Sequence, residues 1–195
     1  MRLLQTVGPV LKPIDVADLK VHTVVTDAAD DVYLDELIDV AREQVEADTG
    51  RALVEQTWQL VGGQFPAEIS VPKPPLVSVT FIKYFDTSGV QQTLPVEDYQ
   101  VLVTSIGASI CPAPGKSWPA VQAGRYNAVV VEFVAGYVVD DGQGGTTGAI
   151  PARARQALMV WAAHLYENRE HMSTLRQQEL PSYQRLISGL EVGLL

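Results

Sequence analysis

The chain has 195 residues, 47% hydrophobic and 19% charged, and a chain of this size buries roughly 70% of its unfolded surface, so it needs no disulfides to fold. Its single cysteine, Cys111, excludes an internal disulfide and a thiol cluster for zinc. Its net charge of -9 disfavours tight binding to nucleic acid, because that affinity comes mainly from lysine and arginine at the phosphates.

The chain begins with a short apolar stretch, Met1 to Val10, which Gln5, Gly8 and Pro9 interrupt. This stretch is too broken for the core of a signal peptide. No segment approaches the roughly twenty apolar residues that a membrane span needs. We therefore expect neither export by that route nor a membrane partner, and the default environment is a reduced cytoplasm.

A short helix is predicted after Pro13, which suits a first helical turn, with Asp15 near the positive end of the helix dipole. Its buried side is expected to hold Val16 and Leu19, with Val21 as a further candidate. A loop over residues 23–29 should follow.

A longer amphipathic helix is predicted over residues 30–49, ending at Gly50. Its apolar residues recur at spacings of three and four: Leu34, Leu37, Ala41 and Val45. Its opposite face is expected to meet water or a basic partner, because Arg42 is the one base among five acids: Asp31, Asp35, Asp39, Glu43 and Glu46.

The period of the hydrophobic pattern changes to two from Thr57, which predicts β-strands. A hairpin is expected after Gly62 and Gly63, and three prolines should form an extended lead-in to the strand Leu76 to Phe85. A turn over 86–89 and further strands at 91–94, 99–103, 108–111 and 128–137 would complete a small sheet or open barrel. The last strand should be central, because both of its faces are apolar.

A second major helix is expected to start at Ile150-Pro151, after a glycine-rich stretch that should be a mobile loop. Its wide apolar stripe is interpreted as core packing, with excess width available to a neighbour: Ala154, Ala157, Leu158, Trp161, Ala162 and Leu165. Pro181 should stop this helix. The apolar stretch beyond it, 186–195, should either fold back onto its own subunit or dock on another protein.

No catalytic, cofactor-binding or metal-binding set is predicted. Cys111 has no local nucleophile signature, and a serine or cysteine nucleophile would need an oriented base. His164 and His171 lie seven residues apart without a third nearby ligand. The acids between Asp27 and Asp31 lack the glycine and the closing glutamate of a calcium loop.

An ordered series of short motifs runs along the chain. They are Thr49-Gly50-Arg51-Ala52-Leu53, Thr57-Trp58, Phe65-Pro66, Pro72-Lys73-Pro74-Pro75-Leu76-Val77-Ser78-Val79, Trp118-Pro119, Ala135-Gly136-Tyr137, Ile150-Pro151 and Tyr166-Glu167-Asn168-Arg169-Glu170. Each is weak alone. In this order and spacing, the chain resembles over nearly its whole length the head-tail connector, or adaptor, proteins of long-tailed bacteriophages and related gene-transfer particles.

The resemblance implies an α+β fold, with a helical connector body and an inserted small antiparallel β domain. The body would consist of N-terminal helices and a C-terminal helix. The expected divisions are 1–51 for the N-terminal helical part, 52–138 for the β-rich insertion, 139–149 for a flexible glycine-rich loop, 150–180 for the C-terminal helix and 181–195 for an apolar tail.

The resemblance also implies a structural role without enzymatic activity or a cofactor. Such proteins form a homo-oligomeric ring, usually of twelve copies, below the portal protein, and they bind a tail-side connector or stopper protein. The ring extends the DNA channel, and an acidic lining would let DNA slide through without specific binding. The expected location is the head-tail junction of a virion that is assembled in the host cytoplasm.

Two sets of residues are candidate sites. A contact between subunits or the lining of the channel is expected to use Asp35, Asp39, Glu43, Glu46, Arg153 and Arg155. Docking on the portal is expected to use the tail residues Leu186, Ile187, Leu190, Val192, Leu194 and Leu195. Which face would line the channel stays open.

Two other classes of function remain as alternatives. A carbohydrate- or peptide-binding β module could use Trp118 and Tyr126 as stacking platforms. A hydrolase could bring Cys111 or a serine to a distant histidine, His22 or His164.

Overall fold

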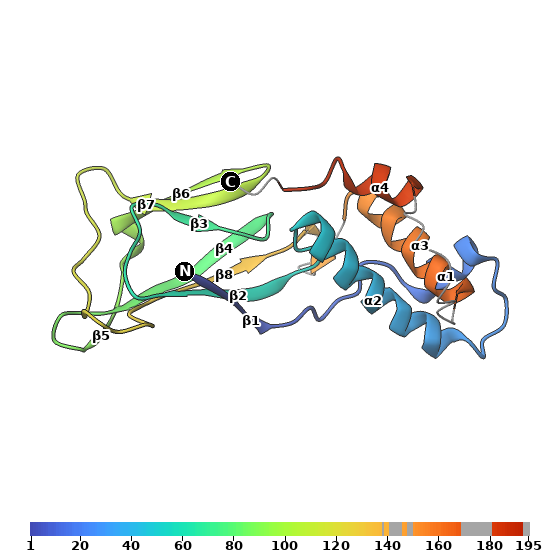
Figure 1. Cartoon of the computed structure of the whole chain (residues 1–195), viewed down its shortest axis with the longest axis horizontal. Helices are drawn as coiled ribbons and strands as arrows, with labels where there is room; N and C mark the ends of the chain where they lie inside the picture. The colour runs from blue at the N-terminus through green and yellow to red at the C-terminus, as the bar shows by residue number, and fades with distance from the viewer. Residues whose placement is uncertain (138, 141–145, 148–149, 169–180, 193–195) are drawn as a thin grey trace, which may run out of the picture. The chain divides into compact units, whose positions relative to one another are not determined.

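The computed structural model describes residues 1–137, 139–140, 146–147, 150–168 and 181–192 (Figure 1). The chain divides into two compact units, each built from two segments. The first, here called the β unit, comprises Met1–Val10 and Glu55–Val138, and the second, the helical unit, comprises Leu11–Val54 and Val139–Leu195. The predicted α+β class is confirmed.

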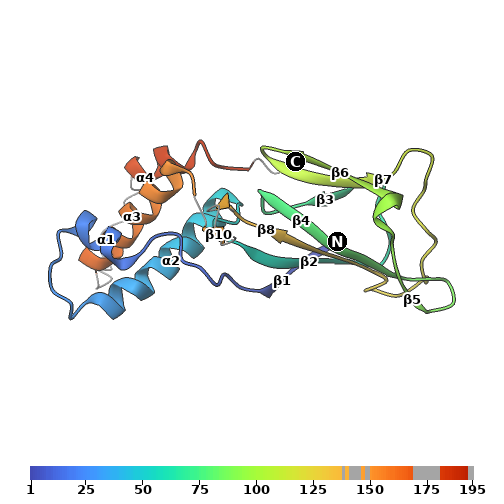
Figure 2. The ribbon, with the colours of Figure 1, turned by 180° about the vertical axis from the view of Figure 1, so that it is seen from behind.

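The β unit contains two antiparallel sheets, one with the strand order β1-β2-β8-β4-β5 and a smaller one with the order β3-β7-β6 (Figure 2). Its strands are β1 (Arg2–Val7), β2 (Gln56–Gly62), β3 (Ile69–Val71), β4 (Leu76–Phe85), β5 (Gln91–Thr93), β6 (Tyr99–Thr104), β7 (Gly107–Pro112) and β8 (Val129–Ala135), with a 3-10 turn at Val96–Asp98 before β6.

Strand β8 is the central strand of the larger sheet, as predicted, and it pairs with β2 on one side and β4 on the other. Every second residue of β8 is fully buried, beginning with Val129. Val131 lies between Leu60 of β2 and Ile82 of β4, and all three side chains are buried. This row of aliphatic side chains crosses three strands and forms the centre of the sheet's packed face.

The predicted turn between β4 and β5 is held by Asp86. Its carboxylate accepts hydrogen bonds from the backbone N–H groups of Ser88 and Val90, at 2.9 and 3.0 Å, and from the side chain of Gln92. These bonds lower the pKa of Asp86, with Gln92 the largest contributor. Gly89 supplies the positive φ of +81° that closes the turn.

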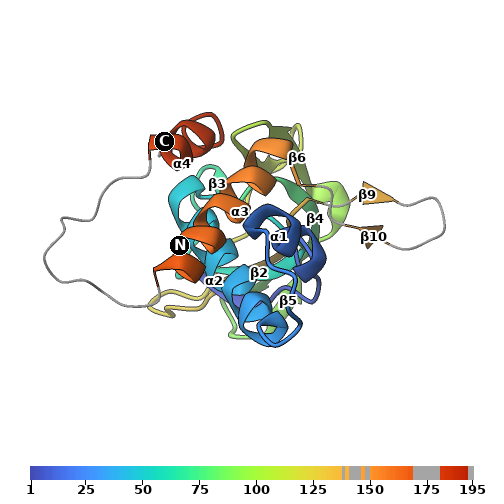
Figure 3. The same ribbon diagram turned by 90° about the vertical axis from the view of Figure 1, so that its right-hand side faces the viewer.

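The helical unit is built from four helices, α1 (Val16–Thr23), α2 (Asp31–Thr49), α3 (Ala152–Glu167) and α4 (Pro181–Ile187), in the part of the chain that the structure describes. Helix α2 packs against α1 and α3 (Figure 3). Its apolar stripe is buried as predicted, and α3, which packs against α2, carries three fully buried small side chains of the kind that allow close approach of a neighbouring helix: Ala154, Ala157 and Ala162. Gly50 ends α2 in the left-handed conformation, with φ of +72°.

Three predictions for the first part of the chain are wrong. Residues 1–51 are not all helical, because Arg2–Val7 forms β1, which pairs with β2. No hairpin follows Gly62, since both neighbours of β2 are strands distant in sequence. Val21 is not buried but is 82% exposed, while Leu19 is fully buried.

The second part of the chain also differs from prediction. The expected loop over 139–149 includes two short paired strands, β9 (Val139–Asp140) and β10 (Thr146–Thr147), while 141–145 and 148–149 lie outside the described residues. Pro181 does not stop α3, which ends at Glu167; it begins α4, because its fixed φ and missing N–H suit the first helical turn. Residues 169–180 of the expected C-terminal helix lie outside the described residues.

No helix within the described ranges has both the length and the apolar character that crossing a membrane would take.

The end of α1 offers a test of backbone strain. Val24 caps this helix with φ of +57°, a left-handed conformation that is costly for a β-branched residue. Replacing the 85%-exposed Val24 with glycine should raise the free energy of unfolding of the helical unit by about 0.5–1 kcal/mol. Denaturant unfolding followed by the helical circular dichroism signal would measure the change.

A matched control is Val21→Gly in the same helix, at 82% exposure and without the left-handed conformation. This change should lower the free energy of unfolding by a few tenths of a kcal/mol, since glycine disfavours a helix interior. A loss of stability in both variants would contradict the assignment of strain to Val24.

Candidate functional site

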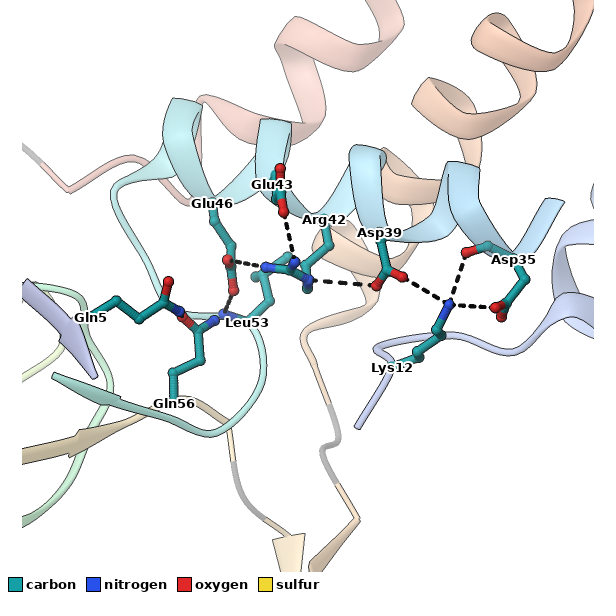
Figure 4. A network of polar contacts seen from close by, with 9 residues as sticks. All are labelled: Gln5, Lys12, Asp35, Asp39, Arg42, Glu43, Glu46, Leu53 and Gln56. Carbon is teal, nitrogen blue, oxygen red and sulfur yellow. Dashed lines mark hydrogen bonds and ion pairs between the residues drawn. The ribbon is translucent and has the colours of Figure 1, made fainter. Parts of the chain in front are cut away.

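Two cations pair with carboxylates on the acidic face of α2: Arg42, from the helix itself, and Lys12, which the sequence did not place there. Lys12, from the segment before α1, lies with its Nζ 2.8 Å from a carboxylate oxygen of Asp35 and 2.9 Å from one of Asp39 (Figure 4). The same ammonium donates to the backbone carbonyl of Asp35 at 2.9 Å. Lys12 therefore ties the extended segment to the helix through two adjacent turns.

The pKa of Lys12 reflects this position. Burial lowers it, but the hydrogen bonds and charges of Asp35 and Asp39 outweigh burial and raise the pKa above its ordinary value. Because the pKa of Lys12 is raised, the stabilisation of the folded state by this ion pair is complete below the ordinary lysine pKa. It is lost only as the pH rises through the raised pKa. The contact is thus intact throughout the neutral range.

The second cation, Arg42, is buried and pairs with Glu46. Its Nη1 lies 2.8 Å from Glu46 Oε2, and its Nη2 lies 3.2 Å from Glu43 Oε1. The other oxygen of Glu46 accepts the backbone N–H of Leu53 at 2.7 Å. Glu46 therefore binds both its own helix and the chain that leaves it (Figure 4).

These contacts correct the predicted character of the face. Glu46 is 8% exposed and cannot meet water or a basic partner. The network contains four carboxylates and two cations, so its net charge is -2. The four carboxylates alone would give -4. Asp35, Asp39 and Glu43 keep side-chain exposures of 48%, 47% and 72% and remain accessible.

The two arginines of α3 occupy different environments. Arg155 pairs with Asp18 of α1 at 2.5 Å and so connects two helices of its own subunit. The guanidinium of Arg153 lies against Gly189, which has no side chain to obstruct it. Of the residues predicted for this surface, the structure joins Asp35, Asp39, Glu43 and Glu46 in one network and places both arginines outside it.

The segment after Pro181 folds back onto the helical unit. Tyr183, Ile187 and Leu190 are 2%, 3% and 7% exposed. The predicted tail residues Leu186 and Val192 are half-buried, and Leu194 and Leu195 lie outside the described residues. Ile187 and Leu190 are therefore covered within the helical unit and are not a free docking surface.

Hydrogen bonds fix this segment to the end of α2. The Tyr183 hydroxyl donates to Asp48 Oδ2 at 2.6 Å, and burial, with the Asp48 carboxylate second, raises the pKa of Tyr183 far above its usual range. Arg51 Nε donates to the Leu190 carbonyl at 2.6 Å, and the Val192 N–H donates to the Thr49 carbonyl at 2.9 Å. Sequence separation hid these contacts, because residues about 140 positions apart share no local pattern.

The residues of the alternative functions are also placed. Trp118 stacks on Phe65 with ring centroids 4.7 Å apart and an interplanar angle of 7°, so one face of its indole is covered. Tyr126 is 95% exposed. Cys111 lies 3.2 Å from the Gln100 side-chain amide. Across the described part of the chain, no group of three or more histidine, cysteine or acidic side chains could hold a metal ion.

The buried ion pair predicts an unequal response to mutation. Arg42→Ala should lower the free energy of unfolding of the helical unit by about 3 kcal/mol, because it leaves the Glu46 carboxylate buried without its cation. Glu43→Gln is the control, since Glu43 is 72% exposed at its side chain and should change stability by under about 0.5 kcal/mol. Urea unfolding of both variants would measure the difference, and equal losses would contradict it.

The attachment of α4 predicts a second response. Tyr183→Phe should destabilise the helical unit by about 1 kcal/mol, because the buried hydroxyl loses its bond to Asp48. Tyr126→Phe, at a 95%-exposed position, should leave stability unchanged. Thermal unfolding of the two variants provides the comparison, and an unchanged Tyr183→Phe would mean that this bond does not hold α4.

Comparisons with known proteins give one kind of match. No family model and no curated protein matches the sequence. Solved structures do match: a chain from the neck of an empty GTA particle computed with C6 symmetry has a TM-score of 0.79 at 21% identity, covering 100% of this chain and 97% of its own. A chain from the virion of a native gene transfer agent (GTA) particle has a TM-score of 0.75 at 21% identity, with the same coverage. A chain from the neck of a native GTA particle computed with C12 symmetry has a TM-score of 0.74 at 22% identity, again with that coverage. This chain therefore shares its fold with chains from the neck and the virion of GTA particles.

Proposed function

We propose that this chain is a structural head-tail connector, or adaptor, of a tailed phage or phage-like particle. In this role it forms a ring below the portal protein, extends the DNA channel and binds a tail-side connector or stopper protein. Twelve copies are the proposed number. The protein would carry out no reaction and need no cofactor, and it would assemble in the host cytoplasm before residing at the head-tail junction of the virion.

The observation that carries the proposal is the full-length likeness in fold. The match covers 100% of this chain and 97% of a GTA neck chain, so it includes both the β unit and the helical unit. Many small α+β modules could share one unit by chance. A match that covers both units makes a shared structural role the simplest explanation.

The distribution of charge supports a role around DNA without binding to it. The helical unit holds 17 acidic and 9 basic side chains, giving -8, whereas the β unit holds 6 and 5, giving -1. A surface of the same sign as the phosphates repels DNA and favours sliding over adhesion. We therefore assign the lining of the channel to the helical unit, with Asp35, Asp39 and Glu43 as accessible candidates and buried Glu46 left out.

Portal docking requires a narrower proposal than the sequence suggested. Ile187 and Leu190 pack inside the helical unit, so they stabilise the subunit and do not wait for a partner. Leu186 and Val192 are half-buried and retain some exposed apolar surface at the end of the described chain. Docking through this end would use those two residues.

The proposal predicts self-assembly into closed rings. The purified chain, studied over a wide range of concentrations with and without the portal protein of its particle, should give rings by native mass spectrometry and negative-stain electron microscopy. Rings should form more readily with the portal present, because a partner that binds only the ring stabilises it by mass action. A monomer at every concentration that also fails to bind the portal would refute the proposal.

A further inference from the structure

Strand β6 leaves one edge of the smaller sheet open. It is the last strand in the order β3-β7-β6, and no described strand pairs with its outer side. Its pairing with β7 is regular throughout, from Tyr99 opposite Pro112 to Thr104 opposite Gly107. The backbone N–H and C=O groups of the outer edge are therefore arranged for pairing with another strand.

The usual protections of an edge strand are missing from β6. Natural edges carry charges, proline or a bulge that prevent another chain from pairing. Residues 99–115 contain no charged side chain, β6 contains no proline, and its register with β7 has no irregularity. An open edge of this kind marks a site of association.

Apolar side chains are exposed on both faces of this strand. Leu102 is 62% exposed on one face, and Val101 and Val103 are 39% and 54% exposed on the other. Ile106, in the turn that follows, is 46% exposed. Only Tyr99 at the start of β6 is buried, so most of the strand contributes little to the core of its own unit.

The charge of the chain favours a second copy as the partner of this edge. The helical units of two copies each carry a net charge of -8 and repel each other. The β units each carry a net charge of -1 and can approach with little electrostatic cost. An uncharged strand in the nearly neutral unit is thus where like copies meet most easily.

A different open edge is available on the same unit. Strand β1 ends the larger sheet, has six residues like β6, and exposes Leu4 by 52%. Its first residue, Arg2, is charged and its register with β2 shifts between Gln5 and Val7, so its regular and uncharged part is Leu3 to Gln5. Two unlike edges on one unit permit a head-to-tail contact, which repeats around a ring, whereas one edge meeting itself would stop at a dimer.

We propose that the outer edge of β6 in one copy pairs with the outer edge of β1 in the next copy, so that a continuous β contact links neighbouring subunits. This inference rests on the ring of the proposed function and names the surface that closes it. Backbone hydrogen bonds supply the attachment, and Leu102, Val103 and Leu4 supply the apolar contact.

The first test adds a charge to each edge. Leu102→Lys and Leu4→Lys should each raise the concentration for half-assembly roughly tenfold or more, because lysine on an open edge opposes pairing. Val90→Lys is the control: it adds the same charge to the β unit at a 55%-exposed turn position. Sedimentation velocity measures assembly, and circular dichroism verifies that each variant is folded.

The second test identifies the edges that meet. In a Cys111→Ser background, copies carrying Leu4→Cys are mixed with copies carrying Leu102→Cys and treated with a short bismaleimide. Cross-linked dimers should appear in the mixture and not with either variant alone. Cross-linking of Leu102→Cys to itself, or rings without cross-links in the mixture, would overturn the β6–β1 pairing.

The two proposals fail differently. If Leu102→Lys forms rings at the wild-type concentration, the edge contact is wrong and the ring role stands. If the unmodified chain forms no ring with or without the portal protein, the ring role fails and the edge contact fails with it.

Discussion

The organisation of the helical unit depends on the two contacts that the carboxylate of Glu46 makes. One of its oxygens accepts from the Arg42 guanidinium at 2.8 Å and the other accepts the backbone N–H of Leu53 at 2.7 Å. A buried charge is tolerated only when it is paired and hydrogen-bonded, and Glu46 satisfies both conditions with partners on either side of the end of α2. The carboxylate that forms an ion pair inside α2 therefore also holds the backbone of the chain that leaves the helix.

These contacts reduce the number of acidic side chains over residues 30–49 that are free to act on other molecules. Part of the negative charge serves the fold: Asp35 and Asp39 bind Lys12 of the segment before α1, and Glu46 binds the backbone of Leu53 after α2. The charge that remains accessible on this face is smaller and lies at Asp35, Asp39 and Glu43. The acidic composition thus predicts long-range repulsion of other anions, but it does not show which residues form a contact surface.

The sequence was informative wherever the determinant was local. Helix α2 and its glycine cap, the β4–β5 turn and the central position of β8 all follow from periodicity or turn chemistry within a few residues. The pairing of β1 with β2 was missed because the partners are about 55 residues apart and Arg2–Val7 shows no alternation of polar and apolar residues. The burial of Leu190 was missed for the same reason, since its partner Arg51 lies 139 positions away. The burial of Glu46 was missed although Leu53 is only seven positions away, because the helical period assigned Glu46 to the acidic, exposed face of α2.

The open edge of β6 also makes the isolated chain prone to aggregation. Short uncharged segments rich in valine, leucine and isoleucine are the common starting points of cross-β fibrils, and residues 99–104 fit that description while one edge stays open. The hazard grows with the concentration of unassembled copies. Strong overproduction of the isolated chain would therefore lose protein to insoluble material, and covering the β6 edge would prevent that loss.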